Sequence, residues 1–273
     1  MKDRPIGVFD SGVGGLTVAR EVLRQLPAES VLYLGDTARV PYGPRGRDTV
    51  ERFALELTEF LLAQEVKALV IACNTISATV AESIRAVSPV PVFDVVHPTV
   101  RAAVSATRTG RIGVIGTVGT VRSGVYETLG KALRPDLRVW ARECPLFVPI
   151  AEENLEDHPV ARLMAEEYLR AFEGTEVDVL ILGCTHYPLL RRVIGEVATK
   201  QVGRDVRLVD SAEPTVAELA RHLAEQRLLR SGAPRHRFCV TDASYKFLQI
   251  ANAILERDVS SEVQQVILGS GNH

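Results

Sequence analysis

The sequence lacks long apolar runs and any excess of positive charge. Its longest apolar runs, such as VLILG and ALVIAC, are far shorter than the roughly 18 residues that a membrane span requires, so no membrane association is expected. Its 32 Lys and Arg residues are balanced by 34 Asp and Glu, and they form no basic stripe, which argues against nucleic-acid binding. No apolar segment precedes the first strand-like run at residues 4–10, so we expect no secretory signal peptide.

Cysteine is also scarce, with four residues in a chain of 273: Cys73, Cys144, Cys184 and Cys239. They are widely dispersed and include no CxxC pair, which excludes a disulfide framework and a zinc ribbon, and no metal is expected. A reduced, cytoplasmic protein is the expectation. The composition, 46% hydrophobic and 24% charged, is that of an ordinary globular protein, and the length suits two compact domains or one large α/β unit.

Short apolar runs alternate with longer amphipathic segments along the whole chain. The runs are continuously apolar rather than alternating, which is typical of parallel strands covered on both faces. This alternation predicts an α/β fold with open, doubly wound, mainly parallel sheets. Strands are predicted at residues 4–10, 30–36, 67–73, 89–95, 110–116, 137–143, 178–184 and 205–210, and helices at 16–26, 49–65 and 160–174.

The chain contains an internal echo, by which we mean two pairs of similar segments separated by nearly the same number of residues. KALVIACNT (67–75) aligns at its cysteine with DVLILGCTH (178–186), an offset of 184 − 73 = 111, and IGVFDSGVGG (6–15) resembles IGVIGTVGTV (112–121), an offset of 112 − 6 = 106. The echo predicts two similar α/β halves whose strand ends face each other across a cleft, where ligands of such sheets bind. The alternative is that any two parallel strands with Gly-rich ends look alike.

The two cysteines of the echo, Cys73 and Cys184, each end an apolar run and are followed at once by polar residues. Cys73 alone could be a small core residue. A thiol at a strand tip before a helix N-terminus would instead have its pKa lowered from about 8.5 toward neutrality, which makes it a usable base or nucleophile. His186, two residues past Cys184, could accept a proton or stabilise a charge there, or it could be a surface residue.

Three further stretches leave alternatives open. DSGVGGLT (10–17) is either a tight strand-to-helix turn or an anion-binding nest, and Asp10 could cap the helix or could orient or deprotonate a neighbouring acid. VPYGPRG (40–46) could simply turn the chain, or its Tyr42 and Gly43 could line a pocket. The acidic pair after PLFVPIA could begin a solvent-facing helix, or its first member, Glu152, could reach the histidine of the second cysteine turn.

Four blocks of the sequence resemble the signature blocks of bacterial glutamate racemases, in the same order and spacing: DSGVGGLTV (10–18), PYG (41–43), ACNTISA (72–78) and GCTHYP (183–188). The resemblance implies a cofactor-independent, two-base α-proton transfer that interconverts L- and D-glutamate and supplies D-glutamate for peptidoglycan synthesis. It also implies a homodimer. The chain starts close to its first strand, so we expect it to lack the N-terminal extension of activator-controlled members.

The resemblance also implies roles for individual residues. Cys73 and Cys184 would be the two acid/bases, Asp10 would assist Cys73, and His186, supported by Glu152, would assist Cys184. The substrate would be held by Asp10, Ser11, Tyr42, Gly43, Asn74, Thr75, Thr185 and His186. The family fold implies two pseudo-symmetric α/β domains, the first from residues 1–97 plus 207–273 and the second from residues 98–206, with the active-site cleft between them. Cys144 and Cys239 have no polar signature and are expected to be packing residues.

Three other interpretations remain at this stage. A hydrolase or amidotransferase with a cysteine nucleophile would need one essential cysteine and would form a thioester. A two-lobed binding protein for an anionic metabolite would explain a cleft but would leave the paired cysteines without a function. A nucleotide-binding enzyme would need a second phosphate or magnesium motif, which the sequence does not contain.

Overall fold

Two separate sheets, paired throughout in parallel, organise the computed structural model, which describes residues 1–269. The first sheet has six strands in the order β10-β9-β2-β1-β3-β4, and the second has four in the order β6-β5-β7-β8. The strands are β1 (Ile6–Asp10), β2 (Val31–Gly35), β3 (Ala68–Ile71), β4 (Val92–Asp94), β5 (Arg111–Gly116), β6 (Arg138–Glu143), β7 (Val179–Gly183), β8 (Arg207–Val209), β9 (Arg237–Val240) and β10 (Val263–Gln265). The prediction of an α/β fold with parallel sheets is confirmed.

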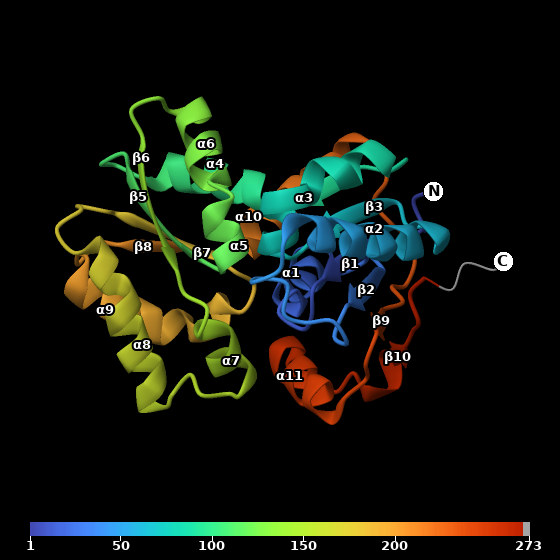
Figure 1. The fold of residues 1–273 in the computed structure, drawn as a ribbon. Coiled ribbons are helices and arrows are strands. Elements are labelled where there is room, and N and C mark those ends of the chain that lie inside the picture. Colours follow the sequence, from blue (N-terminus) through green and yellow to red (C-terminus); the bar gives the residue numbers. More distant parts are fainter. Residues whose placement is uncertain (270–273) are drawn as a thin grey trace.

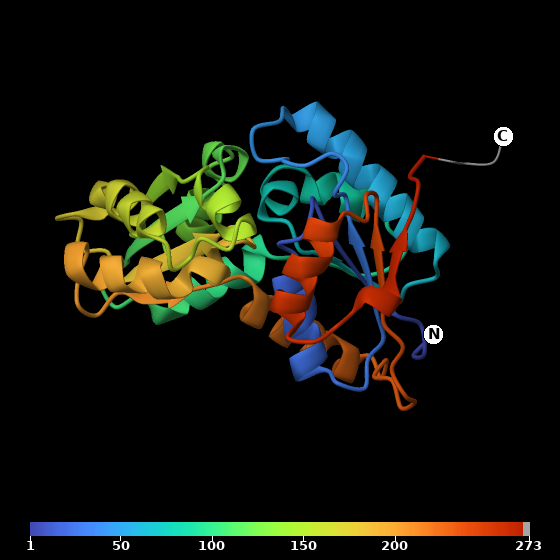
Figure 2. The ribbon, with the colours of Figure 1, turned by 90° about the horizontal axis from the view of Figure 1, so that it is seen from below.

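The two sheets repeat one strand order, which explains the echo in the sequence. The order β2-β1-β3-β4 in the first sheet corresponds to β6-β5-β7-β8 in the second. In this correspondence β1 matches β5 and β3 matches β7, as the two aligned sequence pairs predict. The carboxyl ends of β3 and β7, which lead into the two cysteine turns, therefore occupy equivalent places in the two lobes shown in Figures 1 and 2.

Helices cover both faces of each sheet and form four hydrophobic clusters. One face of the first sheet packs against α1, α10 and α11 and the other against α2 and α3. One face of the second sheet packs against α7, α8 and α9 and the other against α4 and α6. The helices are α1 (Leu16–Gln25), α2 (Arg47–Ala63), α3 (Asn74–Val87), α4 (Val96–Ala106), α5 (Val118–Arg122), α6 (Val125–Leu133), α7 (Phe147–Glu152), α8 (Pro159–Leu169), α9 (Arg191–Gln201), α10 (Ala212–Glu225) and α11 (Tyr245–Leu255).

This covering is why the central strands are continuously apolar. Every residue of β1, β2, β3 and β7 is buried, because each strand contributes side chains to both clusters of its lobe. Burial of one large aliphatic or aromatic side chain contributes roughly 1.5–3 kcal/mol, so these four strands anchor both sheets. Within residues 1–269, the helices are too short or too polar to cross a membrane.

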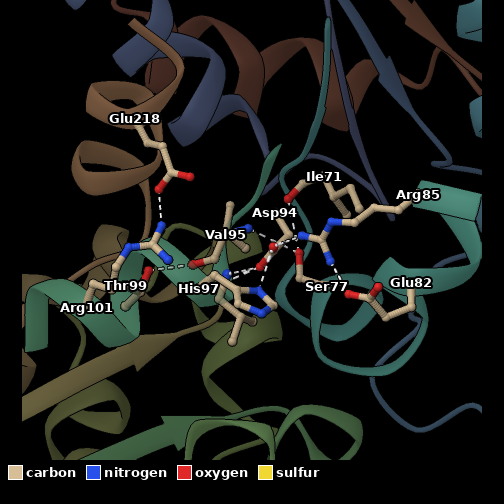
Figure 3. Close-up of polar contacts among 11 residues, drawn as sticks. Ile71, Ser77, Glu82, Arg85, Asp94, Val95, His97, Thr99, Arg101 and Glu218 are labelled. Atoms are coloured by element: carbon tan, nitrogen blue, oxygen red, sulfur yellow. Dashed lines mark hydrogen bonds and ion pairs between the residues drawn. The ribbon is translucent and has the colours of Figure 1, made fainter. Parts of the chain in front are cut away.

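The chain crosses between the lobes at two places that lie next to each other. The first crossing runs through α4, and the second runs from β8 into α10. At the start of α4, buried Asp94 accepts hydrogen bonds from the backbone N–H groups of Val96 (2.7 Å) and His97 (3.0 Å). Figure 3 shows this cluster together with the ion pair between Arg101 of α4 and Glu218 of α10, which ties the two crossings together.

The Asp94 side chain also contacts the imidazole of His97 and the guanidinium of Arg85. Its Oδ2 lies 2.8 Å from His97 Nδ1 and accepts a hydrogen bond from Arg85. Burial alone would raise the pKa of Asp94, but hydrogen bonds and charge from His97 and the charge of Arg85 outweigh burial and lower it to about 2. The carboxylate therefore stays ionised and holds the first turn of the crossing helix.

The structure departs from the predicted organisation in two details. Strands β9 and β10 were not predicted, yet they extend the first sheet beyond β2. Strand β8, residues 207–209, pairs with β7 in the second sheet, whereas the predicted boundary places it in the first domain. The division into two domains otherwise stays a prediction, and residues 270–273 of the predicted first domain lie outside the described residues.

Candidate active site

A cavity of about 330 Å³ lies between the two lobes, at the carboxyl ends of strands from both sheets. It brings together ten of the eleven predicted site residues: Ser11, Tyr42, Gly43, Cys73, Asn74, Thr75, Glu152, Cys184, Thr185 and His186. Asp10 lies behind this lining. Among the described residues that line the cavity there is no lysine or arginine, so hydroxyls, backbone amides, thiols and one imidazole are its hydrogen-bond donors.

Cys73 stands on the wall that the first lobe contributes. It follows β3 by two residues and occupies the N-cap position of α3, where its thiol donates to Ser11 Oγ at 3.4 Å. Burial, with a smaller contribution from the nearby charge of Asp10, raises the pKa of Cys73 to about 12. The expectation that the helix start lowers this pKa toward neutrality is therefore wrong for Cys73, because loss of water around the thiolate outweighs the helix N-terminus.

Asp10 ends β1 directly beneath this wall and is fully buried. Its Oδ2 accepts the backbone N–H of Gly12 at 2.9 Å, while its Oδ1 is buried and has no hydrogen-bond partner among residues 1–269. Burial raises the pKa of Asp10, and the charge of His186 and the amides of the turn only partly oppose the rise. The carboxyl group thus organises the DSGVGG turn and keeps one oxygen unused.

The glycines of that turn allow two close approaches. A Cβ on Gly14 would lie 2.5 Å from Thr185 Oγ1 and from His186 Nδ1, and a Cβ on Gly15 would lie 2.4 Å from the Asp10 Cβ. The turn can therefore pack directly against the cysteine turn of the second lobe, where the hydroxyl of Thr17 also donates to the Thr185 carbonyl at 3.2 Å. Between the two interpretations of DSGVGGLT, close packing of the turn explains these two glycines.

Cys184 stands on the wall that the second lobe contributes, one residue past the end of β7. Its Sγ lies 3.8 Å from His186 Nδ1, and His186 Nε2 lies 3.0 Å from Glu152 Oε1 at the end of α7. Burial alone would lower the pKa of His186, but the hydrogen bonds and charges of Cys184 and Glu152 raise it. A thiol, an imidazole and a carboxylate therefore form a connected series on this wall.

The rest of the lining includes residues that sequence reasoning missed. Thr117 Oγ1 lies 2.9 Å from Thr75 Oγ1 and so joins the two walls. The echo contained a signal for Thr117. In the alignment of residues 6–15 with residues 112–121, Thr117 is the counterpart of Ser11, since 117 − 11 = 106. An apolar part of the lining, Val118, Pro145, Val148 and Pro149, was not predicted either.

The Tyr42 side chain is directed away from a ligand. Its ring is buried and its hydroxyl donates to Asp36, whose other oxygen accepts the hydroxyl of Thr241 at 2.9 Å. The part of the PYG loop left for a ligand is therefore its main chain at Tyr42 and Gly43. Thr241 directly follows β9, so the unpredicted strand supports this loop.

The two remaining cysteines do not belong to the described lining of the cavity. Cys144 and Cys239 are buried in separate hydrophobic clusters, one in each lobe, and neither lines the cavity. Burial raises the pKa of both thiols, as it does for Cys73, so it is their position outside the cavity lining that sets them apart. The site can therefore present two thiols, one from each lobe, to a small molecule that carries anionic groups.

Comparison with known proteins agrees with this geometry. The family model described as Asp/Glu/Hydantoin racemase matches residues 6–219. A glutamate racemase of Syntrophus aciditrophicus is 49% identical over 93% of this chain and 94% of its own length. The solved structure of glutamate racemase isoform RacE1 from Bacillus anthracis has a TM-score of 0.92 at 42% identity and covers 98% of both chains. The glutamate racemase from Francisella tularensis, solved in complex with D-glutamate, has a TM-score of 0.92 at 37% identity and covers 99% of this chain and 100% of its own.

Proposed function

Because the chain belongs to the Asp/Glu/hydantoin racemase family, we propose that it interconverts L- and D-glutamate by proton transfer between Cα and two thiols, those of Cys73 and Cys184. The chain is an isomerase of the racemase type. The observation that carries the proposal is that one cavity is lined by a cysteine from each lobe, each at the carboxyl end of an equivalent strand. The proposed role of the product is to supply D-glutamate for peptidoglycan synthesis.

The chemistry needs two acid/bases because a proton leaves one face of Cα and returns to the other. In each direction one cysteine must act as thiolate and the other as thiol, so each needs partners of its own. On the Cys184 side, His186 can exchange a proton with the thiol, and Glu152 stabilises the resulting imidazolium. On the Cys73 side, the raised pKa keeps the proton on sulfur, and Ser11 and Asp10 are the groups that orient it.

The deprotonated intermediate carries negative charge that spreads onto the α-carboxylate, and the proposed site must stabilise it. Its means are preorganised donors in a cavity that excludes water. The start of α3 provides backbone N–H groups at Asn74 and Thr75, where a helix N-terminus favours an anion. Thr185 lies across the cavity, and the main chain of Tyr42 and Gly43 is proposed to hold the side-chain carboxylate.

The test is incubation of the purified protein with L-glutamate in D₂O, without added cofactor. We expect deuterium at Cα and loss of optical rotation as D-glutamate forms. Absence of exchange with any acidic amino acid would overturn the proposal.

Single cysteine variants test the two-thiol mechanism. We expect Cys73→Ser and Cys184→Ser each to abolish racemisation, because one face of Cα loses its acid/base. Cys239→Ser, which alters a buried thiol outside the cavity, is the matched control and should racemise as the wild type does. Racemisation by both single variants would refute the two-thiol assignment, and a thioester in the intact mass would favour a cysteine nucleophile instead.

A further inference from the structure

The side-chain amide of Asn74 is held by hydroxyls from outside its own lobe. Its Nδ2 donates to Tyr126 Oη at 3.0 Å and to Ser211 Oγ at 3.1 Å. Tyr126 lies in the first turn of α6 in the second lobe, and Ser211 lies on the crossing that leads back into α10. All three side chains are buried, so these hydrogen bonds form out of contact with bulk water.

Both hydrogens of the Nδ2 group are used by these two contacts, which leaves the oxygen of the amide. Asn74 Oδ1 is buried and has no hydrogen-bond partner within the part of the chain that the structure describes, although Asn74 lines the cavity between the two thiols. A buried acceptor without a partner is costly, and native proteins rarely retain one. The orientation of the amide therefore keeps an acceptor available beside Cys73, the next residue in the chain.

The Ser211 hydroxyl contacts the Asn74 amide and the Tyr126 hydroxyl. Serine is among the residues most favoured at a helix N-cap, where its oxygen usually accepts a backbone N–H. Ser211 occupies the N-cap position of α10, yet its side chain makes no capping hydrogen bond and contacts Asn74 instead. The hydroxyl therefore joins Asn74 and Tyr126 and does not cap its own helix.

Tyr126 connects the two cysteine turns. Its hydroxyl meets Asn74, which follows Cys73, and it also lies close to Gly183, which precedes Cys184: a Cβ at Gly183 would be 3.5 Å from Tyr126 Oη. The same hypothetical Cβ would lie 2.8 Å from the Ile115 carbonyl oxygen, so this strand end is tightly packed. The Tyr126 hydroxyl thus contacts the Asn74 amide on one wall and lies beside the end of β7, which carries Cys184, on the other wall.

We propose that Tyr126 and Ser211 are positioning residues that hold the Asn74 amide with its Oδ1 as an acceptor for the α-ammonium group of the amino-acid substrate. The inference rests on the proposed function, since the ammonium group belongs to glutamate. Without the Tyr126 hydroxyl, the amide is free to turn over and to present Nδ2, a donor, to the ammonium group. Binding of an amino acid then weakens, whereas binding of a dicarboxylate without an ammonium group does not depend on this acceptor.

Tyr126→Phe tests the proposal, with D-glutamate as substrate and glutarate, the corresponding dicarboxylate without the ammonium group, as competitive inhibitor. Loss of one buried hydrogen bond and of the amide orientation is expected to raise the KM for D-glutamate about five- to twentyfold. The inhibition constant of glutarate should stay unchanged, and kcat should fall less than KM rises. Ser211→Ala, which removes one oxygen, should give the same pattern and serves if Tyr126→Phe fails to fold.

Tyr245→Phe is the matched control, because Tyr245 is 76% exposed and does not line the cavity. It should leave the KM and the inhibition constant unchanged. An equal rise of the KM for D-glutamate and of the inhibition constant of glutarate in Tyr126→Phe would overturn the proposal, since it would assign the hydroxyl a packing role alone. Unchanged constants would overturn it too. Failure of the wild type to exchange the α-proton of glutamate would refute the proposed function itself, before any variant is compared.

Discussion

Replacement of Glu152 by glutamine isolates the charge that supports His186. The Glu152 carboxylate lies 3.0 Å from His186 Nε2, and its side chain is 26% exposed, so water screens part of its charge. Glutamine keeps the shape of the side chain and a hydrogen-bond acceptor but removes the negative charge. Any change in the pKa of His186 therefore reports the electrostatic contribution of this carboxylate.

The magnitude follows from the hydrogen bond that is weakened. A hydrogen bond to a charged group contributes about 1.5–3 kcal/mol, which corresponds to about one to two pH units in the pKa of His186, and partial exposure favours the lower end. The pKa of His186 is raised in the folded protein. Its contribution to stability is therefore complete below its ordinary pKa and is lost as the pH rises through the folded-state pKa. In Glu152→Gln this loss should occur at a lower pH.

Two measurements check this expectation. Titration of ¹³C-labelled histidine by NMR should show a lower pKa for His186 in Glu152→Gln, and the alkaline decline of α-deuterium exchange should begin at a lower pH. Glu153→Gln is the matched control, since the neighbouring carboxylate lies on the surface with 60% of its side chain exposed and pairs with Lys246 at 2.5 Å. An unchanged His186 titration in Glu152→Gln, or an equal change in the control, would refute the reasoning.

Two further substitutions test the turn and the crossing. Gly15→Ala should lower α-deuterium exchange roughly a hundredfold, because a Cβ 2.4 Å from the Asp10 Cβ must displace that side chain. Gly46→Ala should have no effect, because its Cβ would meet no atom within 4 Å among the described residues beyond its own chain neighbours. Asp94→Asn should reduce the free energy of unfolding at pH 7 by about 2 kcal/mol, measured by urea denaturation, since the pKa of Asp94 is lowered to about 2 from 3.8. That contribution is present above pH 3.8 and is lost as the pH falls toward 2, so an equal difference between wild type and variant at pH 2 would contradict this account.

The parts of the fold that could be predicted are those in which one physical requirement, burial on both faces of the sheet, determines the type of every residue. The central strands are buried on both faces, so their apolar runs are unambiguous, and each predicted strand is present. Strand β9 follows a polar stretch and is only four residues long, and β10 reads VQQ because it lies at the edge of its sheet. Such strands form because a neighbouring strand offers hydrogen-bond partners, which the local sequence does not reveal.

The features of the site likewise divide into those that the local sequence predicts and those that depend on the whole fold. The cysteine turns could be found because strand, thiol and polar residues are consecutive, and the echo places them in register. The contact between Glu152 and His186 joins residues 34 positions apart, and nothing in their spacing specifies it, so it was expected only from the family resemblance. The pKa of Cys73 was predicted in the wrong direction because the helix start is visible in the sequence whereas burial depends on the whole fold.

The thiols of Cys73 and Cys184 have different neighbours. The thermodynamics of racemisation limits how far this difference can affect kcat and KM for the two enantiomers. L- and D-glutamate have equal free energies, so their equilibrium constant is unity, and kcat/KM must be equal in the two directions whatever surrounds each cysteine. In the proposed two-thiol mechanism, unlike neighbours can therefore change only how the barrier is divided between the step at Cys73 and the step at Cys184. The raised pKa of Cys73 keeps its thiol protonated, so Cys73 is a base only after it has lost this proton, whereas Cys184 has an imidazole 3.8 Å away to receive one. It follows that kcat and KM can each differ between the enantiomers while their ratio cannot, and that a change at Glu152 should shift the α-deuterium isotope effects of the two enantiomers in opposite directions.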